Sequence, residues 1–528
     1  MLQSLMAYRG MATAPHHLAA QAGLSVLREG GNAVEAMVAM ASTIAVVYPH
    51  MNGLGGDGFW LIAAPGKAPV AIEACGTAAA AATPALYEGH AAVPTRGPLA
   101  ANTVAGAVDG WRVALEVSKG WGGRLPLGRL LEEALWHARE GVAVTESQAR
   151  LTLGKLDELL GLPGFAETFL LDGRPPAPGE RLRQPGLAAT LERLAEAGLD
   201  DFYRGELAAA IGAGLQAAGS PVAAADLAGY RARRVAPLTV ELAAGRLHNL
   251  PPPTQGLASL AILALYERMA AEAPEGFDFL HRLVEATKRA FLIRDRVVGD
   301  PEAMTEDPAA CLTDAALDAE LAAIDRRRAA PWPQPLPGEG DTIWMGAIDG
   351  EGRAVSFIQS LYWEFGSGVT LADLGLVWQN RGAAFQLQPG SPRSLVPGRR
   401  PFHTLNPALA RLSDGSTLVY GCMGGEGQPQ TQAAVFARHA LHGIGLQRAV
   451  SRPRWLLGRT WGAESVTLKL ESRFDPALIE ALAAAGHAVE PVGAYDEVMG
   501  HAGAIRLYPD GRLEGAADPR SDGSVAGF

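Results

Sequence analysis

A threonine stands where a proline- and glycine-rich stretch gives way to the pattern of a β-strand. Residues 331–337 (PWPQPLP) lead through Gly-Glu-Gly to Asp341, and the alternating residues 342–348 (TIWMGAI) predict a strand with Thr342 at its head. Cleavage of the bond between Asp341 and Thr342 would give this threonine a free α-amine beside its own hydroxyl. A nucleophile and its base then belong to one residue, as in amide hydrolases with an N-terminal threonine. Threonine is also an ordinary strand former, and on this pattern alone that structural role stays open.

A second hydroxyl is expected beside the first. Residues 349–352 (DGEG) are a strong turn signal, and residues 353–361 (RAVSFIQSL) predict another strand, so the two strands form a hairpin. Folding about this turn brings Thr342 opposite Gln359 and Ser360, to within a residue or so of register. Ser360 is therefore a candidate for supporting the nucleophile.

A glycine-rich turn offers the donors that acyl transfer needs. Residues 420–432 (YGCMGGEGQPQTQ) predict a strand end, a turn at Gly424 and Gly425, and the start of a helix. Backbone N–H groups of consecutive glycines can approach a reacting carbonyl without steric hindrance, and a helix N-terminus adds partial positive charge. A plain strand-to-helix turn would look the same, but a terminal threonine nucleophile in the same chain favours an oxyanion hole.

Helical patterns dominate the first half of the chain and predict the scaffold for these groups. Residues 16–29 and 32–47 predict two helices broken at two glycines, the second rich in alanine and valine and expected to be buried. Further helices are predicted at residues 127–140, 187–197, 206–217 and 279–296, and another follows the rigid turn of residues 251–256 (PPPTQG).

Two patterns resemble ligand sites, and a structural role is favoured for both. Gly53, Gly55 and Gly58 match GxGxxG, but their loop follows a helix and precedes a strand. That order is the reverse of the dinucleotide fingerprint, so a close-packed turn is expected instead. Residues 279–296 carry charges at helical spacing, which is typical of a salt-bridged helix face. The residues concerned are His281, Glu285, Lys288 and Arg289.

Composition makes several classes of function improbable. The chain has 528 residues with 56 acidic and 45 basic side chains and a net charge of −11, so nucleic acid is not an expected partner. One large globular unit is expected, because only the stretch before Thr342 resembles a linker. Cys75, Cys311 and Cys422 lack the spacing of a zinc site or disulfide framework. No signal peptide or membrane helix is recognised, so a cytoplasmic protein is expected. Neither His-rich nor carboxylate clusters argue for a metal or organic cofactor, and none is expected.

Segments spread over nearly the whole length carry a family resemblance. They include YPHMNGLGGDGF, NTVAGAVDGW, PPPTQG, DTIWMGAID, SLYWEFGSG, RRPFHTLNPAL, YGCMGGEGQPQTQ and ADPRSDGSVAGF. In these segments the chain resembles the γ-glutamyltransferase family of self-processing N-terminal-nucleophile hydrolases.

The resemblance implies a fold, a processing step and roles for the residues above. The fold would be α+β, a four-layer αββα sandwich forming one domain. Self-cleavage would give a large subunit, residues 1–341, and a small subunit, residues 342–528, which stay together as a heterodimer; a dimer of these is left open. Thr342 would perform both self-cleavage and acyl transfer, Ser360 would be the supporting hydroxyl, and the glycine turn would form the oxyanion hole.

Departures from the family pattern concern the substrate. Glutamyl-transferring members have an arginine that grips the substrate α-carboxylate about where this chain has Cys75. They have an acidic residue that holds the substrate ammonium about where it has Ala384. Paired serines of those members are replaced here by His403 and Thr404. An α-amino acid head group would therefore find none of its usual partners.

The remaining polar residues suit a small acid amide. Arg381 can bind a carboxylate through its planar fork, and Tyr362, Asn380, His403 and Thr404 are expected around it as substrate-binding residues. Oxamate, the half-amide of oxalic acid, has a carboxylate and no ammonium group. Segments such as GDTIWMG and WQNRGAAF are moreover similar to the oxamate amidohydrolase branch of the family.

Alternatives to this interpretation stay open. A γ-glutamyltransferase or glutathione hydrolase would need a different arginine and acid, supplied from elsewhere in the fold. An uncleaved homologue could keep the fold and only bind a ligand. Arg381 could instead form a structural salt bridge at a sheet edge, and residues 386–400, rich in proline, glycine and arginine, could shape a pocket entrance or form an ordinary exposed connection.

Overall fold

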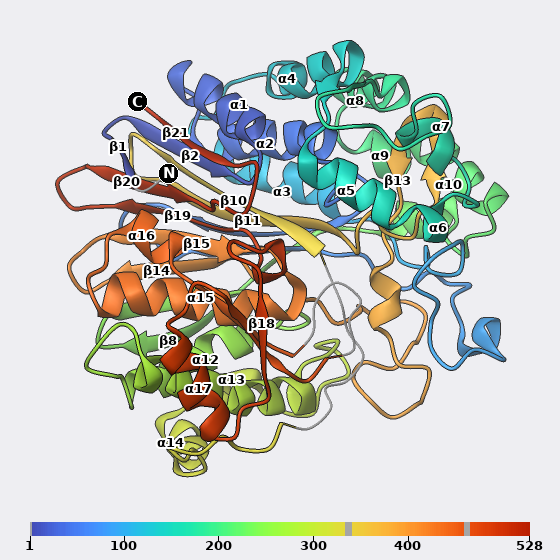
Figure 1. The fold of residues 1–528 in the computed structure, drawn as a ribbon. Coiled ribbons are helices and arrows are strands. Elements are labelled where there is room, and N and C mark those ends of the chain that lie inside the picture. The colour runs from blue at the N-terminus through green and yellow to red at the C-terminus, as the bar shows by residue number, and fades with distance from the viewer. Residues whose placement is uncertain (1–2, 333–340, 459–464) are drawn as a thin grey trace.

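Two seven-stranded antiparallel sheets lie face to face at the centre of the molecule (Figure 1). The computed structural model describes residues 3–332, 341–458 and 465–528. The first sheet has the strand order β21 (Ser524–Gly527), β2 (Gly10–Ala14), β10 (Asp341–Asp349), β11 (Ala354–Tyr362), β3 (Asp57–Ala63), β4 (Val70–Ala74) and β7 (Arg233–Val235). The second has the order β1 (Leu5–Ala7), β20 (Leu513–Ala517), β19 (Ala502–Leu507), β15 (Thr417–Cys422), β14 (Ala408–Leu412), β9 (Gly245–Asn249) and β8 (Leu238–Leu242).

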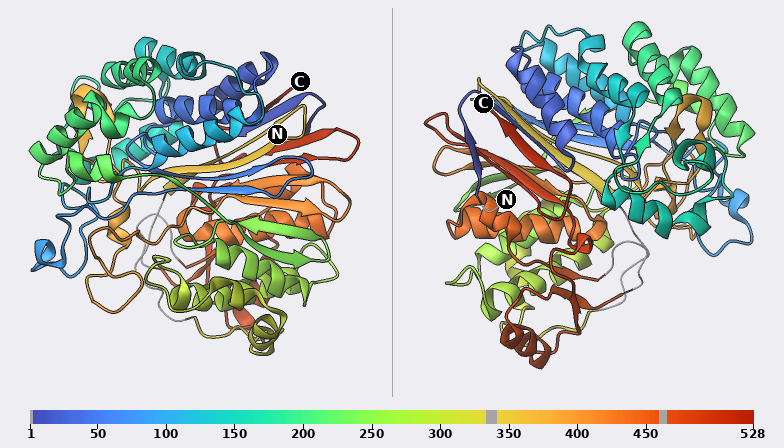
Figure 2. Two further views of the ribbon diagram at one scale, coloured as in Figure 1. Left: turned by 180° about the vertical axis from the view of Figure 1, so that it is seen from behind. Right: turned by 45° about the horizontal axis from the view of Figure 1, so that its top comes forward.

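Helices cover the outer face of each sheet, which completes the four layers that the resemblance implies (Figure 2). Against the first sheet lie α1 (His17–Arg28), α2 (Ala33–Val47) and α3 (Ala107–Lys119). Farther out, α4 (Leu127–Glu140) packs on α2 and α8 (Pro185–Ala197) packs on α4. Beside these helices are α5 (Glu146–Gly154), α6 (Leu156–Leu159), α7 (Phe165–Phe169), α9 (Asp201–Arg204), α10 (Glu206–Ala217) and α11 (Ala224–Gly229). Against the second lie α12 (Gly256–Glu267), α15 (Gln428–Phe436) and α16 (Leu446–Ser451). Farther out, α13 (Phe277–Val297) packs on α12 and α15, with α14 (Asp314–Ala322) and α17 (Pro476–Ala484) beside it. The α+β architecture is as predicted.

Three small sheets complete the strand inventory of the described residues. Two of them are pairs, β5 (Val142–Ala143) with β6 (Arg181–Leu182) and β12 (Thr370–Leu371) with β13 (Leu376–Val377). The third joins β16 (Trp455–Leu457), β17 (Leu468–Glu471) and β18 (Val489–Val492).

The sequence of strand β10 is apolar on both faces because both faces are buried. Ile343, Met345 and Ala347 belong to the core between the first sheet and its helices. The alternate residues Trp344 and Ile348 belong to the core between the two sheets. Because successive side chains of a strand point to opposite faces, a strand covered on both sides must be apolar at nearly every position.

The predicted helices are confirmed, and the sequence also accounts for the start of α2. Asn32 caps this helix by accepting from the backbone N–H of Val34 and Glu35, while the Glu35 carboxylate accepts from the backbone N–H of Asn32 at 2.9 Å. This reciprocal pair is a capping box. Every residue of α2 is buried, as the alanine- and valine-rich pattern predicts.

The charged side chains of α13 do form ion pairs, but three of them are not on the surface. Lys288 Nζ lies 2.7 Å from Glu285 Oε1, and both residues are buried, as is His281. Arg289, which pairs with Glu320 at 2.5 Å, is partly exposed. The predicted ion pairing is thus confirmed for Glu285, Lys288 and Arg289, while helical spacing alone does not distinguish an exposed face from one covered by other segments.

The glycines of the loop before β3 allow close packing, as predicted. A Cβ added at Gly55 would stand 2.1 Å from the Val377 carbonyl oxygen, and one at Gly56 would stand 2.1 Å from that of Ser360. Backbone therefore lies where a side chain would be.

All three cysteines are buried, and none forms a disulfide. Within the described part of the chain, no helix has the length and apolarity to cross a membrane.

Candidate active site

The hairpin of β10 and β11 brings Thr342 and Ser360 together at its open end. Ile343 pairs with Gln359 and Asp341 pairs with Tyr362, so the single residue Thr342 faces two residues of β11. This two-against-one arrangement is a β-bulge, a feature that often redirects a side chain beside an active site. Thr342 and Ser360 are both buried. The predicted neighbourhood is confirmed, while the bulge itself could not be read from the alternating pattern.

The chain is strained where it leaves β11. Tyr362 has a φ of 86°, a left-handed conformation that bulky residues rarely adopt. Its backbone N–H donates to Ser360 Oγ at 2.7 Å, which helps to fix this conformation. The next N–H, that of Trp363, donates to Asn380 Oδ1 at 3.1 Å, and Asn380 Nδ2 donates to the Thr95 carbonyl at 2.8 Å. Both ends of the Asn380 amide are thus engaged by backbone.

The glycine turn has the form that the sequence predicts. It lies between the end of β15 and the start of α15, and Gly424 and Gly425 have φ values of 113° and 50°. Both conformations favour glycine, and a Cβ added at Gly424 would stand 3.3 Å from Gly500 Cα. The following residues form the first turn of the helical segment, so the partial positive charge of a helix N-terminus lies at this turn.

Gln255 contacts this turn, and sequence reasoning did not single it out. Its Nε2 donates to the Gly425 carbonyl at 2.8 Å and to the Thr404 carbonyl at 2.7 Å. Its backbone N–H donates to the His403 carbonyl at 2.9 Å. The fifth residue of the PPPTQG motif thus joins two predicted site segments.

Arg381 is buried without a carboxylate partner. Its guanidinium stacks 3.7 Å above the Tyr362 ring, and Nη1 donates to Thr404 Oγ1 at 3.4 Å. Among the described residues, Nε and Nη2 have no hydrogen-bond partner and no acid pairs with the side chain. The alternative of a structural salt bridge therefore finds no support in the described residues. Burial lowers the pKa of Arg381 to about 10, so the group stays charged at neutral pH.

Asp57 adds an acid that the sequence interpretation missed. Its Oδ1 accepts from the N–H groups of Gly76 at 3.0 Å and Gly106 at 2.9 Å and from Gln379 Nε2 at 3.1 Å. Burial raises the pKa of Asp57 to about 7, although these donors and the Arg381 charge oppose the rise. Asp57 pairs with Ser360 across β3 and β11, which places it one strand from the hydroxyl pair. The only sequence signal for Asp57 is its place between Gly56 and Gly58, in a loop that the sequence interpretation explains as a close-packed turn.

His403 lies beside Oδ2, the other oxygen of the Asp57 carboxylate. Nε2 of His403 lies 3.1 Å from Asp57 Oδ2, though without the alignment of a hydrogen bond. Burial, and secondarily the Arg381 charge, hold the pKa of His403 well below its usual value, so the imidazole is neutral. Arg381, Asp57, His403 and Thr404 together form a buried polar cluster, called here the head-group cluster.

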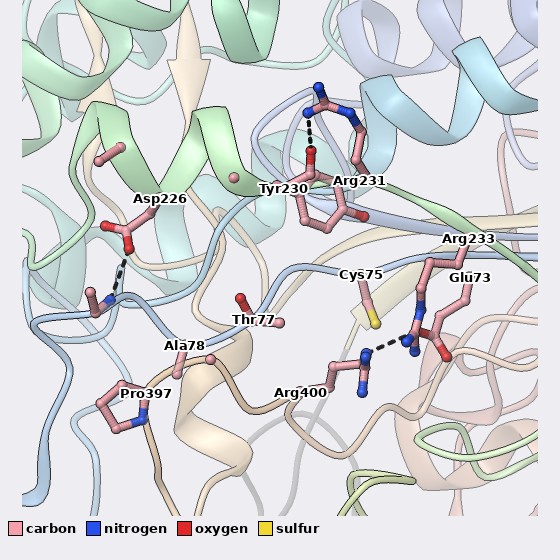
Figure 3. A pocket seen from close by; sticks show the side chains of 14 residues that line it. Glu73, Cys75, Thr77, Ala78, Asp226, Tyr230, Arg231, Arg233, Pro397 and Arg400 are labelled. Atoms are coloured by element: carbon pink, nitrogen blue, oxygen red, sulfur yellow. Dashed lines mark hydrogen bonds and ion pairs between the residues drawn. The ribbon is translucent and has the colours of Figure 1, made fainter.

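A surface cavity of about 570 Å³ lies beside Cys75 (Figure 3). Glu73 in its wall pairs with Arg233 at 2.7 Å and with Arg400 at 3.1 Å. Pro397, Gly398 and Arg400 also line it, so part of residues 386–400 does shape a cavity wall. Burial raises the pKa of the Cys75 thiol well above its usual value, which leaves it uncharged. Neither Thr342 nor Arg381 lines this cavity.

One group of described residues has the composition of a metal site. Potential ligand atoms of His281, Glu285 and His487 lie within 4.8 Å of one another. They already have partners, since His281 Nδ1 lies 2.9 Å from His487 Nε2 and Lys288 neutralises Glu285. The cluster also binds the chain before the proposed cleavage point, because Lys288 Nζ donates to the Ala330 carbonyl at 2.6 Å. This arrangement is that of a buried structural network.

Residues 19–528 match the family model described as gamma-glutamyltranspeptidase. The chain belongs to this family. An oxamate amidohydrolase proenzyme of Klebsiella pneumoniae is 56% identical over 529 residues, covering 100% of both chains. A glutathione hydrolase-like proenzyme of Bacillus subtilis is 41% identical, again over 100% of both chains. Among solved structures, the cephalosporin acylase from Bacillus halodurans superimposes with a TM-score of 0.92 at 32% identity, covering 100% of this chain and 97% of that one. The family resemblance noted in the sequence is thereby confirmed, as is an enzyme of the Ntn-hydrolase class acting on C–N bonds.

Proposed function

We propose that this protein is a self-processing amidohydrolase that converts oxamate to oxalate and ammonia. The observation that carries the proposal is Arg381, a buried charge with two donor nitrogens, Nε and Nη2, that have no hydrogen-bond partner in the described structure, close to the hairpin end that holds Thr342. A small carboxylate that accepts hydrogen bonds from both nitrogens would remove the free-energy cost of burying them without partners. The oxamate amidohydrolase name of the 56% identical relative supports the same substrate.

The processing step is proposed at the bond between Asp341 and Thr342. The names of both relatives describe proenzymes, which supports cleavage into residues 1–341 and 342–528. The first sheet interleaves strands from both pieces, with β2 and β3 from the first flanking β10 and β11 from the second. Separating the pieces would break ladder hydrogen bonds on both sides of the hairpin, so the subunits are expected to stay associated as a heterodimer.

The reaction is proposed as a two-step acyl transfer. The α-amine of Thr342 takes the proton of its own hydroxyl, and Oγ attacks the amide carbonyl while Ser360 supports the hydroxyl. The N–H groups of Gly424 and Gly425 stabilise the oxyanion. The C–N bond then breaks, the proton passes to the leaving nitrogen, and ammonia departs. Water then attacks the acyl-threonine and gives a proton to the amine, the C–Oγ bond breaks, and that proton passes to Oγ as oxalate is released, without a metal or organic cofactor.

The head-group cluster is proposed to hold the substrate carboxylate. Arg381 supplies the charge, Tyr362 orients it by stacking, and Thr404 fixes one guanidinium nitrogen. His403 lines the same site as a neutral group, and Asn380 acts by holding the backbone that follows Tyr362. A cytoplasmic location is proposed from the three unpaired cysteines, which fit a reducing compartment.

A second candidate is hydrolysis of a γ-glutamyl compound. Asp57 near Arg381 is an acid supplied from elsewhere in the fold, and with the arginine it could bind both charges of an α-amino acid. Two observations weigh against it: Asp57 Oδ1 already accepts from three donors, and burial raises the pKa of this carboxyl to about 7.

Ammonia release distinguishes the candidates. Purified, self-cleaved protein is incubated with oxamate and, in parallel, with γ-glutamyl amide. Release from oxamate alone is the expected result. Release from the γ-glutamyl compound alone would refute the oxamate proposal, and a protein that stays a single full-length band on a denaturing gel and releases ammonia from neither would refute the amidohydrolase itself.

A further inference from the structure

Gln255 lies between the two halves of the proposed site. It stands directly before α12 and is fully buried. One side-chain nitrogen donates to the Gly425 carbonyl in the glycine turn and to the Thr404 carbonyl in the head-group cluster. A single side-chain amide thus connects the segment of the proposed oxyanion donors to the segment of the proposed carboxylate site.

The orientation of this amide is fixed by charge. Arg294 Nη1 donates to Gln255 Oε1 at 3.1 Å, and a guanidinium cannot accept a hydrogen bond. The amide oxygen must therefore face Arg294, and the NH₂ group must face the two carbonyls. Arg294 is itself buried and pairs with Asp295 at 2.8 Å and with Glu426 at 3.3 Å. Glu426 follows Gly425 directly, so the arginine also anchors the next residue of the turn.

The glycine turn needs such an anchor. Two consecutive glycines can rotate into conformations of either hand, so their own sterics restrain the direction of their N–H groups only weakly. Holding the Gly425 carbonyl from Gln255 and the Glu426 side chain from Arg294 restrains the turn on its C-terminal side. Oxyanion donors act through their preorganised direction, and a misplacement of about 1 Å is worth on the order of 100-fold in rate.

We propose that Gln255 is a positioning residue for acyl transfer, which holds the glycine turn in the orientation that meets the oxyanion and sets its spacing from Arg381. The inference rests on the proposed function. Gln255 and Arg294 precede the proposed cleavage point, while Thr404, Gly425 and Glu426 follow it. The large subunit thereby orients the donors that the small subunit supplies, although the nucleophile and the turn both belong to the small subunit.

The test compares Gln255→Met with a matched control, Gln184→Met. Gln184 also stands directly before a helix, is buried, and donates from Nε2 to a backbone carbonyl, that of Val46, at 2.7 Å. It lies in the helical layer on the other side of the molecule. Both variants lose hydrogen bonds from a buried side-chain amide to backbone carbonyls, two at Gln255 and one at Gln184, and Gln255→Met also loses the bond accepted from Arg294. A general loss of stability is therefore expected in both, and more of it in Gln255→Met.

Gln255→Met is expected to lower kcat for oxamate about 10- to 100-fold. The inhibition constant of oxalate, which probes binding of the planar ground state, is expected to change less than about threefold, and Gln184→Met to change neither value. A loss confined to KM and to oxalate binding, or an equal loss of kcat in the control, would overturn the positioning role. Gln255→Glu puts an acceptor oxygen against both carbonyls, so its kcat for oxamate at pH 8 is expected to fall at least as far as that of Gln255→Met.

The outcome is separable from the fate of the proposed substrate. If the wild type turns over only a γ-glutamyl amide, the oxamate proposal fails, and the same comparison is made with that amide and with glutamate as the inhibitor. A crystal structure of Gln255→Met gives a readout that needs no activity. The Gly425 carbonyl is expected to turn away from its present direction, and an unchanged glycine turn would overturn the inference for any substrate.

Discussion

Replacing Arg381 by methionine tests the head-group cluster most directly. Methionine keeps the apolar stem of the side chain and removes the guanidinium that stacks over the Tyr362 ring, together with its charge and both unpaired donors. A hydrogen bond to a charged group contributes about 1.5–3 kcal/mol, so two of them with imperfect additivity contribute about 3–4 kcal/mol. At about 1.4 kcal/mol for each factor of ten, kcat/KM for oxamate is expected to fall about 100- to 1000-fold.

The substrate analogue oxamide makes this prediction specific. Oxamide replaces the carboxylate by a neutral amide, so Arg381→Met is expected to change its kcat/KM by less than about tenfold. The control is Arg438→Met, which removes another buried arginine whose pKa burial also lowers to about 10, in a network with Glu275 and Pro453. Arg438→Met is expected to lower stability and leave the ratio of oxamate to oxamide activity unchanged. Equal losses on oxamate and oxamide in Arg381→Met would refute the assignment of Arg381 to the carboxylate.

Three further outcomes are expected. Thr342→Ala should abolish self-cleavage and turnover together, and a variant that still releases ammonia would contradict the nucleophile. Gly56→Ala should destabilise the fold by about 1–3 kcal/mol in urea unfolding and slow turnover, because its Cβ would stand 2.1 Å from the Ser360 carbonyl oxygen; unchanged stability would contradict the close packing. Asp57 has a folded pKa of about 7, above its unfolded value, so the stability of the wild type relative to Asp57→Asn is full below about pH 4 and lost as the pH rises through 7; a difference between pH 5 and pH 8 that does not shrink would contradict it.

Local patterns predicted the scaffold and the reacting hairpin. The helix at residues 127–140 was placed to the residue, because its apolar spacing, bounded by Pro126 and Gly141, is complete within the segment. The hairpin of β10 and β11 was found because its turn signal lies between two strands that are adjacent in sequence. Thr342, Ser360 and the glycine turn were all recognisable within such short windows.

Gln255 and Asp57 were missed for the opposite reason. Gln255 acquires its role from Gly425, 170 residues away, and Asp57 accepts from Gln379, 322 residues away. No periodicity encodes a side-chain contact of that separation, since it depends on how the sheets and helices pack. Both residues sit in segments whose prolines or glycines explained them locally, so nothing in the sequence required a second role.

The protonation of Asp57 gives the two candidate substrates opposite signatures. With a pKa of about 7, Asp57 is about half protonated at neutral pH in the empty site. An anion bound to Arg381 cancels the positive charge that holds this pKa down, so binding should take up protons. An ammonium group placed against Asp57 Oδ2 would instead favour the carboxylate, so binding should release protons.

Calorimetry of the self-cleaved wild type at pH 7, with oxalate and with glutamate as non-reacting ligands, measures this directly in buffers of different ionisation enthalpy. Oxalate is expected to bind with net proton uptake, and Asp57→Asn should abolish that uptake while leaving oxalate binding measurable. Tight binding of glutamate with proton release, together with weak binding of oxalate, would mean that Asp57 is the ammonium partner and that the head-group cluster serves a γ-glutamyl substrate.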